Sequence, residues 1–153
     1  MASPDRYLLD SNIFDKLVDE PGASEIAKRA AASGTTELIT THVQADEIAA
    51  TSNVARREQL LVALSLARQE PTLGFVLGYS RLGEARLSES EPFESLRAGD
   101  DRLTRTRDAL ISSTAQYEGA TLVTEDADMR ARASAAGIPA IGWDEFRRRL
   151  EAR

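Results

Sequence analysis

The sequence predicts an α/β fold, a three-layer α/β/α sandwich with a central, mostly parallel five-stranded sheet. Two observations predict this fold. Short apolar runs alternate with helical patterns, and the runs are apolar at consecutive positions, as in strands buried on both faces. The length of 153 residues is that of one ordinary domain, and neither an internal repeat nor a long linker divides it. We therefore expect a single domain over residues 1–153.

The first half of the chain is expected to contain two strands and three helices. The apolar run Tyr7–Leu9 ends at Asp10, and Asp, Ser and Asn favour turns and helix caps. The pair Pro21-Gly22 divides the helical pattern that follows, while Thr41 can cap the next helix and Pro71 can end it. In chain order, the expected elements are a strand at 7–9, two helices within 12–33, a strand at 37–40 and one long helix at 43–68.

The second half is expected to contain three strands and three helices. The stretch from Gly83 to Gly99 is rich in Ser, Glu and Arg, which predicts a loop or a loose helical excursion. Asp100 or Asp101 can cap the helix after it, and Gly119 can end that helix. In chain order, the expected elements are a strand at 75–77, a helix to about 118, a strand at 121–124, a helix through 131, a strand at 140–141 and a last helix from 144.

The composition excludes several classes of protein. With 42% hydrophobic and 29% charged residues, the chain is close to the globular average, which argues against wholesale disorder. The absence of cysteine excludes disulfides, thiol catalysis and Cys-ligated metals, and a single histidine excludes multi-His metal sites. No apolar run approaches the ~18 residues of a spanning helix, and the N-terminus does not look like a signal peptide. We expect a cytoplasmic protein.

The charge balance bears on nucleic-acid binding. A net charge of -6 and a pI of about 4.9 argue against general binding driven by phosphate contacts, which is typical of basic domains. They do not exclude a nuclease, because an enzyme that gathers carboxylates around a divalent cation concentrates acidic residues at that site.

Two acidic motifs come directly after predicted strands. Asp10 follows the first strand, and Asp126 and Asp128 follow the strand at 121–124. Ligands of open α/β sheets bind outside the carboxyl ends of the strands, so these acids lie where a site is expected. Each could equally be a helix cap, and position alone does not decide between the two.

Two further acids, Glu47 and Asp108, occupy helix positions in line with apolar residues. A carboxylate buried there would need an arginine, a proton or a cation as its partner. Alternatively, Glu47 interacts with the dipole near a helix start, and Asp108 pairs at the surface with Arg105 or Arg107. The apolar residues at helical spacing are Val43, Ala50, Val54 and Leu61 for Glu47, and Ile111 and Ala115 for Asp108.

Asp10, Glu47, Asp108 and Asp126 could converge on one point if a cation neutralised them. Like charges at a few ångströms raise one another's pKa, and a hard divalent ion that prefers oxygen ligands removes this repulsion. Mg²⁺ or Mn²⁺ held there would activate a water and stabilise the charge that develops on a phosphate. The sequence thus predicts a phosphodiester hydrolase site without histidine.

The order, spacing and flanking residues of these acids resemble the PIN domain, and most of all the toxin ribonucleases of bacterial VapBC-type toxin–antitoxin modules. This resemblance implies that Asp10, Glu47, Asp108 and Asp126 bind Mg²⁺ or Mn²⁺ and catalyse hydrolysis of RNA. It matches Asp128 to a less constant fifth metal ligand, and it matches Ser11, Asn12 and Thr124 to polar residues that support the ligands. The segments that carry it are 8–13, 41–48, 107–111 with 114–115, and 120–129.

The resemblance also implies partners. A small antitoxin would occupy the active-site groove by inserting an arginine or a helix among the acids, the toxin would form a homodimer, and RNA would be the substrate. Arginines that flank the acidic motifs are candidates for RNA contacts, with ordinary surface ion pairing as the alternative: Arg102, Arg105, Arg130 and Arg132. Ser11 replaces the usual threonine but keeps the hydroxyl. The stretch from Leu73 to Gly99 is longer and more polar than in the smallest members, which leaves the substrate and the partner surface open.

Other families fit less well. Phosphatases of the haloacid-dehalogenase type need a second aspartate where Asn12 stands, and receiver domains need a lysine after their last strand, whereas no lysine follows Lys28. Neither a Gly-x-Gly-x-x-Gly motif nor a phosphate loop is present. The competing functional class is a PIN-like module that keeps its acids but acts by protein association with little catalysis. Because all four acids are present, we favour catalysis.

Overall fold

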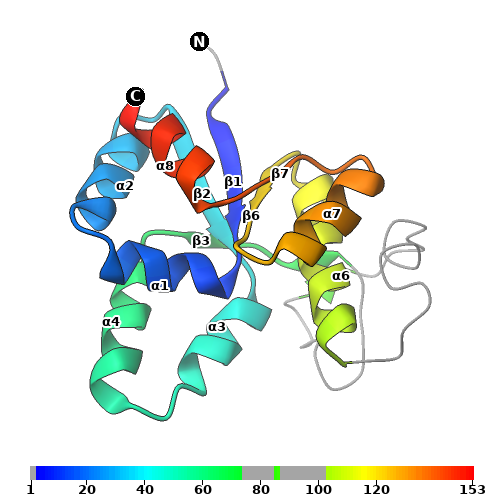
Figure 1. The fold of residues 1–153 in the computed structure, drawn as a ribbon, viewed down its shortest axis with the longest axis horizontal. Coiled ribbons are helices and arrows are strands. Elements are labelled where there is room, and N and C mark those ends of the chain that lie inside the picture. Colours follow the sequence, from blue (N-terminus) through cyan, green and yellow to red (C-terminus); the bar gives the residue numbers. More distant parts are fainter. Residues whose placement is uncertain (1–2, 74–84, 87–102) are drawn as a thin grey trace.

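The computed structural model describes residues 3–73, 85–86 and 103–153, and a five-stranded sheet forms its centre (Figure 1). The strand order is β3-β2-β1-β6-β7, and all four pairings are parallel. The strands of this sheet are β1 (Asp5–Leu9), β2 (Thr36–Thr40), β3 (Arg68–Gln69), β6 (Thr121–Val123) and β7 (Ala140–Ile141). A second, two-stranded parallel sheet joins β4 (Thr72–Leu73) to β5 (Ala85–Arg86).

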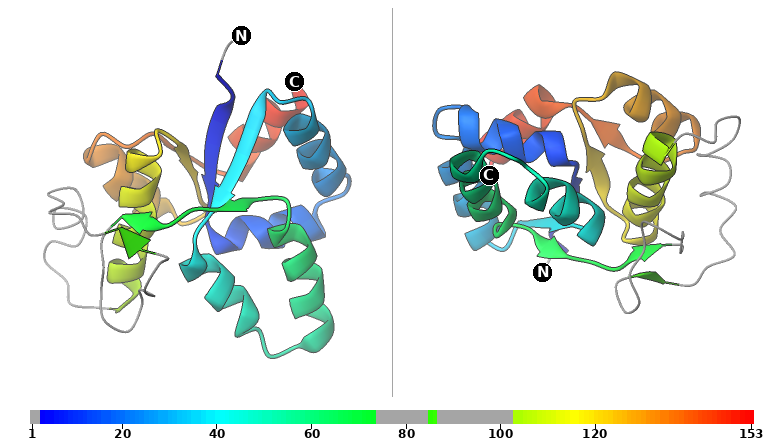
Figure 2. Two further views of the ribbon diagram at one scale, coloured as in Figure 1. Left: turned by 180° about the vertical axis from the view of Figure 1, so that it is seen from behind. Right: turned by 90° about the horizontal axis from the view of Figure 1, so that it is seen from below.

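Helices cover both faces of the central sheet (Figure 2). On one side lie α1, α2, α4 and α8, on the other lie α6 and α7, and α3 lies beyond the carboxyl ends of β1 and β2. None of the described helices combines the length and apolar character needed to cross a membrane. The helices are α1 (Ser11–Asp19), α2 (Ala23–Ala32), α3 (His42–Ala49), α4 (Val54–Leu64), α6 (Leu103–Tyr117), α7 (Ala127–Ala135) and α8 (Trp143–Glu151).

The core is divided by the sheet into two clusters, as the alternation of side chains along β1 requires. Tyr7 and Leu9 pack with α1, α2 and α8, whereas Leu8 packs with α6 and α7. In the first cluster, the ring of Phe146 packs edge-on against Tyr7, with 5.1 Å between the ring centroids. These two cores confirm the predicted three-layer α/β/α sandwich.

The predicted long helix at 43–68 is wrong, because the chain forms two helices there. α3 ends at Ala49 and α4 begins at Val54, with Asn53 as the N-cap of α4. The Asn53 side chain accepts a hydrogen bond from the backbone N–H of Arg56, which favours a new helix start over continuation. Val54 is 56% exposed, so the apolar spacing that seemed to join it to Glu47 does not mark one buried helix face.

The third strand of the sheet was also not predicted. Arg68 and Gln69 form β3 beside Ile39 and Thr40, although the sequence predicts a helix as far as Arg68. Both β3 side chains are polar and exposed, so a search for apolar runs passes over this edge strand. The predicted strand at 75–77 and the caps at 100 or 101 lie outside the described residues. So does most of the stretch at 83–99, of which 85–86 form β5 instead of a loop.

Replacing Asn53 by alanine is expected to lower the free energy of unfolding by about 1 kcal/mol. Alanine removes the oxygen that accepts the Arg56 N–H at 2.9 Å. Urea unfolding monitored by circular dichroism measures the loss. Asn53→Ser keeps a capping oxygen and should retain most of the stability, so an equal loss in both variants would contradict the role of this cap.

Candidate functional site

The candidate site lies where the direction of the sheet's connections changes. From β1 the chain continues to β2 and β3 on one side, whereas β6 and β7 lie on the other. Such a switch point leaves a crevice outside the carboxyl ends of the two central strands. Asp10 follows β1, and Thr124 and Asp126 follow β6, so the predicted motifs flank this crevice from both strands.

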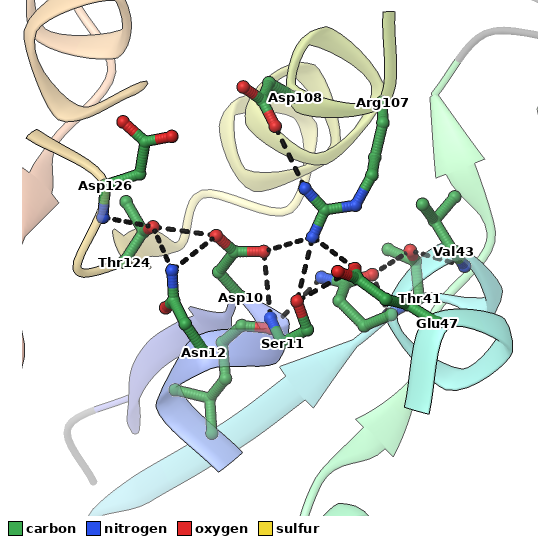
Figure 3. Close-up of polar contacts among 12 residues, drawn as sticks. Asp10, Ser11, Asn12, Thr41, Val43, Glu47, Arg107, Asp108, Thr124 and Asp126 are labelled. Carbon is green, nitrogen blue, oxygen red and sulfur yellow. Dashed lines mark hydrogen bonds and ion pairs between the residues drawn. The ribbon is translucent and has the colours of Figure 1, made fainter. Parts of the chain in front are cut away.

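Asp10 is the most constrained carboxylate of the site. It is 2% exposed, and it accepts hydrogen bonds from the backbone N–H of Ser11 at 2.8 Å and from Thr124 Oγ1 at 2.7 Å. Asn12 Nδ2 lies 3.3 Å from the same Oδ2 atom that Thr124 contacts. Two of the three predicted supporting side chains, Asn12 and Thr124, therefore orient this acid, and Figure 3 shows them around it.

Ser11, the third predicted supporting residue, connects two acidic residues. Its backbone N–H donates to Asp10, and its hydroxyl donates to Glu47 Oε2 at 2.9 Å. Glu47 projects from α3, and its side chain is 49% exposed, so it is not the buried helix carboxylate that the apolar spacing predicted. It still faces the site, because α3 begins directly after β2, at the carboxyl edge of the sheet.

A guanidinium lies at the point where the acids meet (Figure 3). Arg107 Nη2 is 2.9 Å from Asp10 Oδ1, 2.5 Å from Glu47 Oε2 and 2.8 Å from Ser11 Oγ, and Nη1 is 3.1 Å from Asp108 Oδ1. Burial opposes the charge on Arg107, but the three carboxylates outweigh it and hold its pKa above the ordinary value. Arg107 thus holds together acids from three separate elements.

Asp108 is buried behind Arg107 on α6. It is 4% exposed, and its second oxygen, Oδ2, accepts a hydrogen bond from Arg132 Nη2 at 2.9 Å. Burial raises the pKa of Asp108 to about 6; Arg107 and Arg132 oppose the rise, while Asp10 and Asp126 add to it. The prediction that Asp108 lies on a core-facing position of its helix is confirmed.

Asp126 caps α7, its side chain accepting the Met129 N–H at 2.9 Å. It is exposed and lines the same groove as Asp10 and Glu47, whereas Asp128, also exposed, is not among the described residues that line it. The groove, which we call the acidic groove, has a volume of about 320 Å³. Its lining includes Asp10, Glu47, Arg107 and Asp126 at one end, and Asp15 and Arg56 toward α4.

Two of the four arginines predicted to contact RNA bind other groups of the protein. Arg130 Nη1 donates to the Thr124 carbonyl at 2.6 Å, and Arg132 binds Asp108. Arg105 lies on α6, and Arg102 is outside the described residues. Arg130 thus supports the strand end that carries Thr124, and Arg132 supports Asp108, roles that their proximity in sequence did not indicate.

The carboxylate oxygens of the site are the ligands that a hard divalent cation prefers, although the Arg107 guanidinium lies between them. As the side chains stand, no three acidic or histidine side chains among residues 3–73, 85–86 and 103–153 form a group that could hold a metal ion. The site nevertheless fits a cation, since carboxylate oxygens of Asp10, Glu47 and Asp108 already surround one positive group. Such a cation would require Arg107 to move.

Sequence reasoning did not identify Arg107 as a site residue. It appeared as a possible surface partner of Asp108 and within the matched segment 107–111, without a role of its own, and nothing in its local sequence indicates contacts with Asp10, 97 positions away. Its position one residue before a core-facing acid near the start of α6 was the only available clue, and neighbouring helix residues generally face different directions.

Comparison with known proteins agrees with the fold. The model of the PIN domain, a family whose members are generally nucleases, matches residues 7–135. No curated protein matches the chain.

Solved structures with a similar fold include PAE2754 from Pyrobaculum aerophilum, with 19% identity, a TM-score of 0.57 and coverage of 98% of this chain and 99% of that one. VapBC2 from Rickettsia felis, solved with a promoter DNA fragment, has 18% identity, a TM-score of 0.57 and coverage of 91% and 99%. VapBC-1 from nontypeable Haemophilus influenzae has 14% identity, a TM-score of 0.53 and coverage of 91% and 98%. Since the family model spans most of the sequence and the sheet carries the matching motifs at its carboxyl edge, this chain belongs to the PIN domain family.

Proposed function

We propose that this protein is an endoribonuclease that depends on Mg²⁺ or Mn²⁺, and that it is the toxin of a toxin–antitoxin pair. The observation that carries the proposal is the convergence of Asp10, Glu47 and Asp108 on one positive group at the switch point of the sheet. PIN domains are generally nucleases and typically use divalent metals, which supports this reading of the acids. We further propose that residues 1–153 act as a single domain.

Asp10, Glu47, Asp108 and Asp126 would hold the metal, directly or through water, with Asp128 as a fifth acid. Bound there, the ion would supply an activated water and neutralise the charge that develops on the phosphate. The chain's own side chains prepare the ligands for this role. Thr124 and Asn12 orient Asp10, and Ser11 orients Glu47, as supporting hydrogen bonds commonly do around metal ligands.

The RNA would enter through the acidic groove, which is open to solvent and borders Arg56 on the side of α4. A strongly acidic surface repels phosphates, so neutralisation of the carboxylates is a condition for RNA binding as well as for catalysis. Arg102, Arg105, Arg130 and Arg132 remain candidate RNA contacts, although Arg132 would first have to release Asp108.

Proteins of similar fold indicate which partners this chain could bind. Two of the similar solved structures are VapBC proteins, and one of these was solved with promoter DNA. We propose by this likeness that a small antitoxin covers the acidic groove and that the toxin forms a homodimer. Co-expression of a short protein encoded beside this gene, followed by co-purification and sizing, tests both statements.

Removing divalent metal is expected to abolish cleavage of RNA. Purified protein is incubated with labelled total RNA and transfer RNA in EDTA, and then with Mg²⁺ or Mn²⁺ restored. Cleavage should appear only with the metal, and an identically prepared Asp10→Asn variant controls for contaminating ribonuclease. If wild type and variant are equally inert on every RNA while metal still binds, the non-catalytic interaction module becomes the better assignment.

A further inference from the structure

We propose that Arg107 is a built-in competitor of the divalent cation, so that metal binds only when this guanidinium leaves the acids. The inference rests on the proposed function, because it concerns the same carboxylates. It makes Arg107 a residue that sets the metal concentration at which the site fills. Arg107 thereby controls whether the metal ion is bound, and it does so without contacting the substrate.

The contacts of Arg107 make the two cations mutually exclusive. Its Nη atoms lie 2.5 to 3.1 Å from Asp10 Oδ1, Glu47 Oε2 and Asp108 Oδ1. Mg²⁺ binds carboxylate oxygens at about 2.0–2.1 Å and requires nearly octahedral geometry. An ion that uses these oxygens would have to occupy the space filled by the guanidinium, so one cation must displace the other.

Arg107 is held mainly by the acids, with one further hydrogen bond from its Nη2 to Ser11 Oγ at 2.8 Å. Its side chain is 17% exposed, and its Nε is buried without a hydrogen-bond partner among the described residues. Burying such a group without a partner is unfavourable, and the attraction of Asp10, Glu47 and Asp108 offsets that cost. Once a divalent ion takes over the carboxylates, little remains to keep the guanidinium inside, and the acidic groove gives it a way out to solvent.

This arrangement makes opposite predictions for the protein with and without metal. Arg107→Gln removes the competitor, so Mn²⁺ should bind at least about tenfold more tightly than to wild type, as expected from loss of charge-assisted contacts. Without metal the same variant leaves three carboxylates around an uncharged side chain, and its melting temperature should fall. Addition of Mn²⁺ should then raise the melting temperature of the variant by more than that of wild type.

The experiment is calorimetric titration of Mn²⁺ into the metal-stripped protein, together with thermal unfolding at each Mn²⁺ concentration. RNA is absent, so the readout does not depend on activity. Arg56→Gln is the matched control, because Arg56 lines the same groove but pairs with Asp15 at 2.5 Å and with Asp19 at 2.6 Å, not with the four acids. It loses the same charge and should gain less than about twofold in affinity.

Arg107→Lys covers the case in which Arg107→Gln does not fold. Lysine keeps the positive charge but lacks the planar guanidinium that contacts several carboxylates at once. The Mn²⁺ affinity of Arg107→Lys should therefore be higher than that of wild type and lower than that expected for Arg107→Gln. Affinity equal to wild type in every Arg107 variant that folds overturns the inference and leaves the proposed function standing. The same gain in Arg56→Gln also overturns it, since the effect would then be one of net charge. Absence of Mn²⁺ binding in every protein contradicts both the inference and the proposed metal dependence.

Discussion

Replacing Asp10 by asparagine is expected to reduce metal-dependent RNA cleavage by about a hundredfold to a thousandfold, the range seen when one central electrostatic group is removed from an active site. Asp10 is the acid with the most donors around it, including Ser11 N, Thr124 Oγ1 and Arg107 Nη2. Asparagine has nearly the same shape but no charge, and its amide nitrogen must face at least one of these donors. Single-turnover cleavage of a labelled RNA at saturating Mg²⁺ measures the loss.

The matched control for Asp10→Asn is Asp15→Asn. Asp15 lines the same groove, but its side chain is 50% exposed and its ion pair is with Arg56. The control should keep activity within about threefold of wild type, because surface ion pairs contribute about 1 kcal/mol or less. Asparagine also caps helices about as well as aspartate, so Asp10→Asn should still fold with α1 intact. Equal losses in the two variants would contradict a special role for Asp10.

The strand-end part of the site could be predicted because two simple rules combine there. Apolar runs identify β1 and β6, and parallel strands bring the residues after them to one edge. The supporting roles of Thr124 and Asn12 were predicted from the resemblance to the PIN domain, and both side chains lie at these strand ends within hydrogen-bond distance of Asp10. The edge strand β3 was not predicted because both of its residues are polar and exposed, whereas apolar patterns detect only buried strands.

The helical part of the site was predicted less securely. For Asp108 the helix pattern was right, since Ile111 and Ala115 are fully buried on the same helix. For Glu47 the apolar spacing ran across the break between α3 and α4. The residue does lie close to the other acids, but the helix pattern used to select it was wrong. Arg107 could not be predicted, because its contacts depend on how α6 packs against the strand ends, which is a tertiary property.

Asp108→Asn is expected to make the metal-stripped protein more stable at pH 7 while abolishing cleavage. The pKa of Asp108 is raised from 3.8 to about 6, chiefly by burial, so its charged form is disfavoured in the folded state. Since one pKa unit corresponds to about 1.4 kcal/mol, the ionised group lowers the free energy of unfolding by up to about 3 kcal/mol at pH 7. Asparagine resembles the protonated acid and should remove most of this cost.

The stability gain of Asp108→Asn over wild type should depend on pH, with a definite sign. Between about pH 4 and pH 6 the folded state binds more protons at Asp108 than the unfolded state does, so the contribution of Asp108 to stability rises as the pH falls. The gain should therefore be largest at pH 7, be small at pH 4 and vanish at about pH 3. Urea unfolding in EDTA across this range measures it, and a variant that is less stable at pH 7, or a pH-independent difference, would contradict the argument. If neutralising Asp108 makes the protein more stable but inactive, then the charge serves the chemistry and lowers the free energy of unfolding.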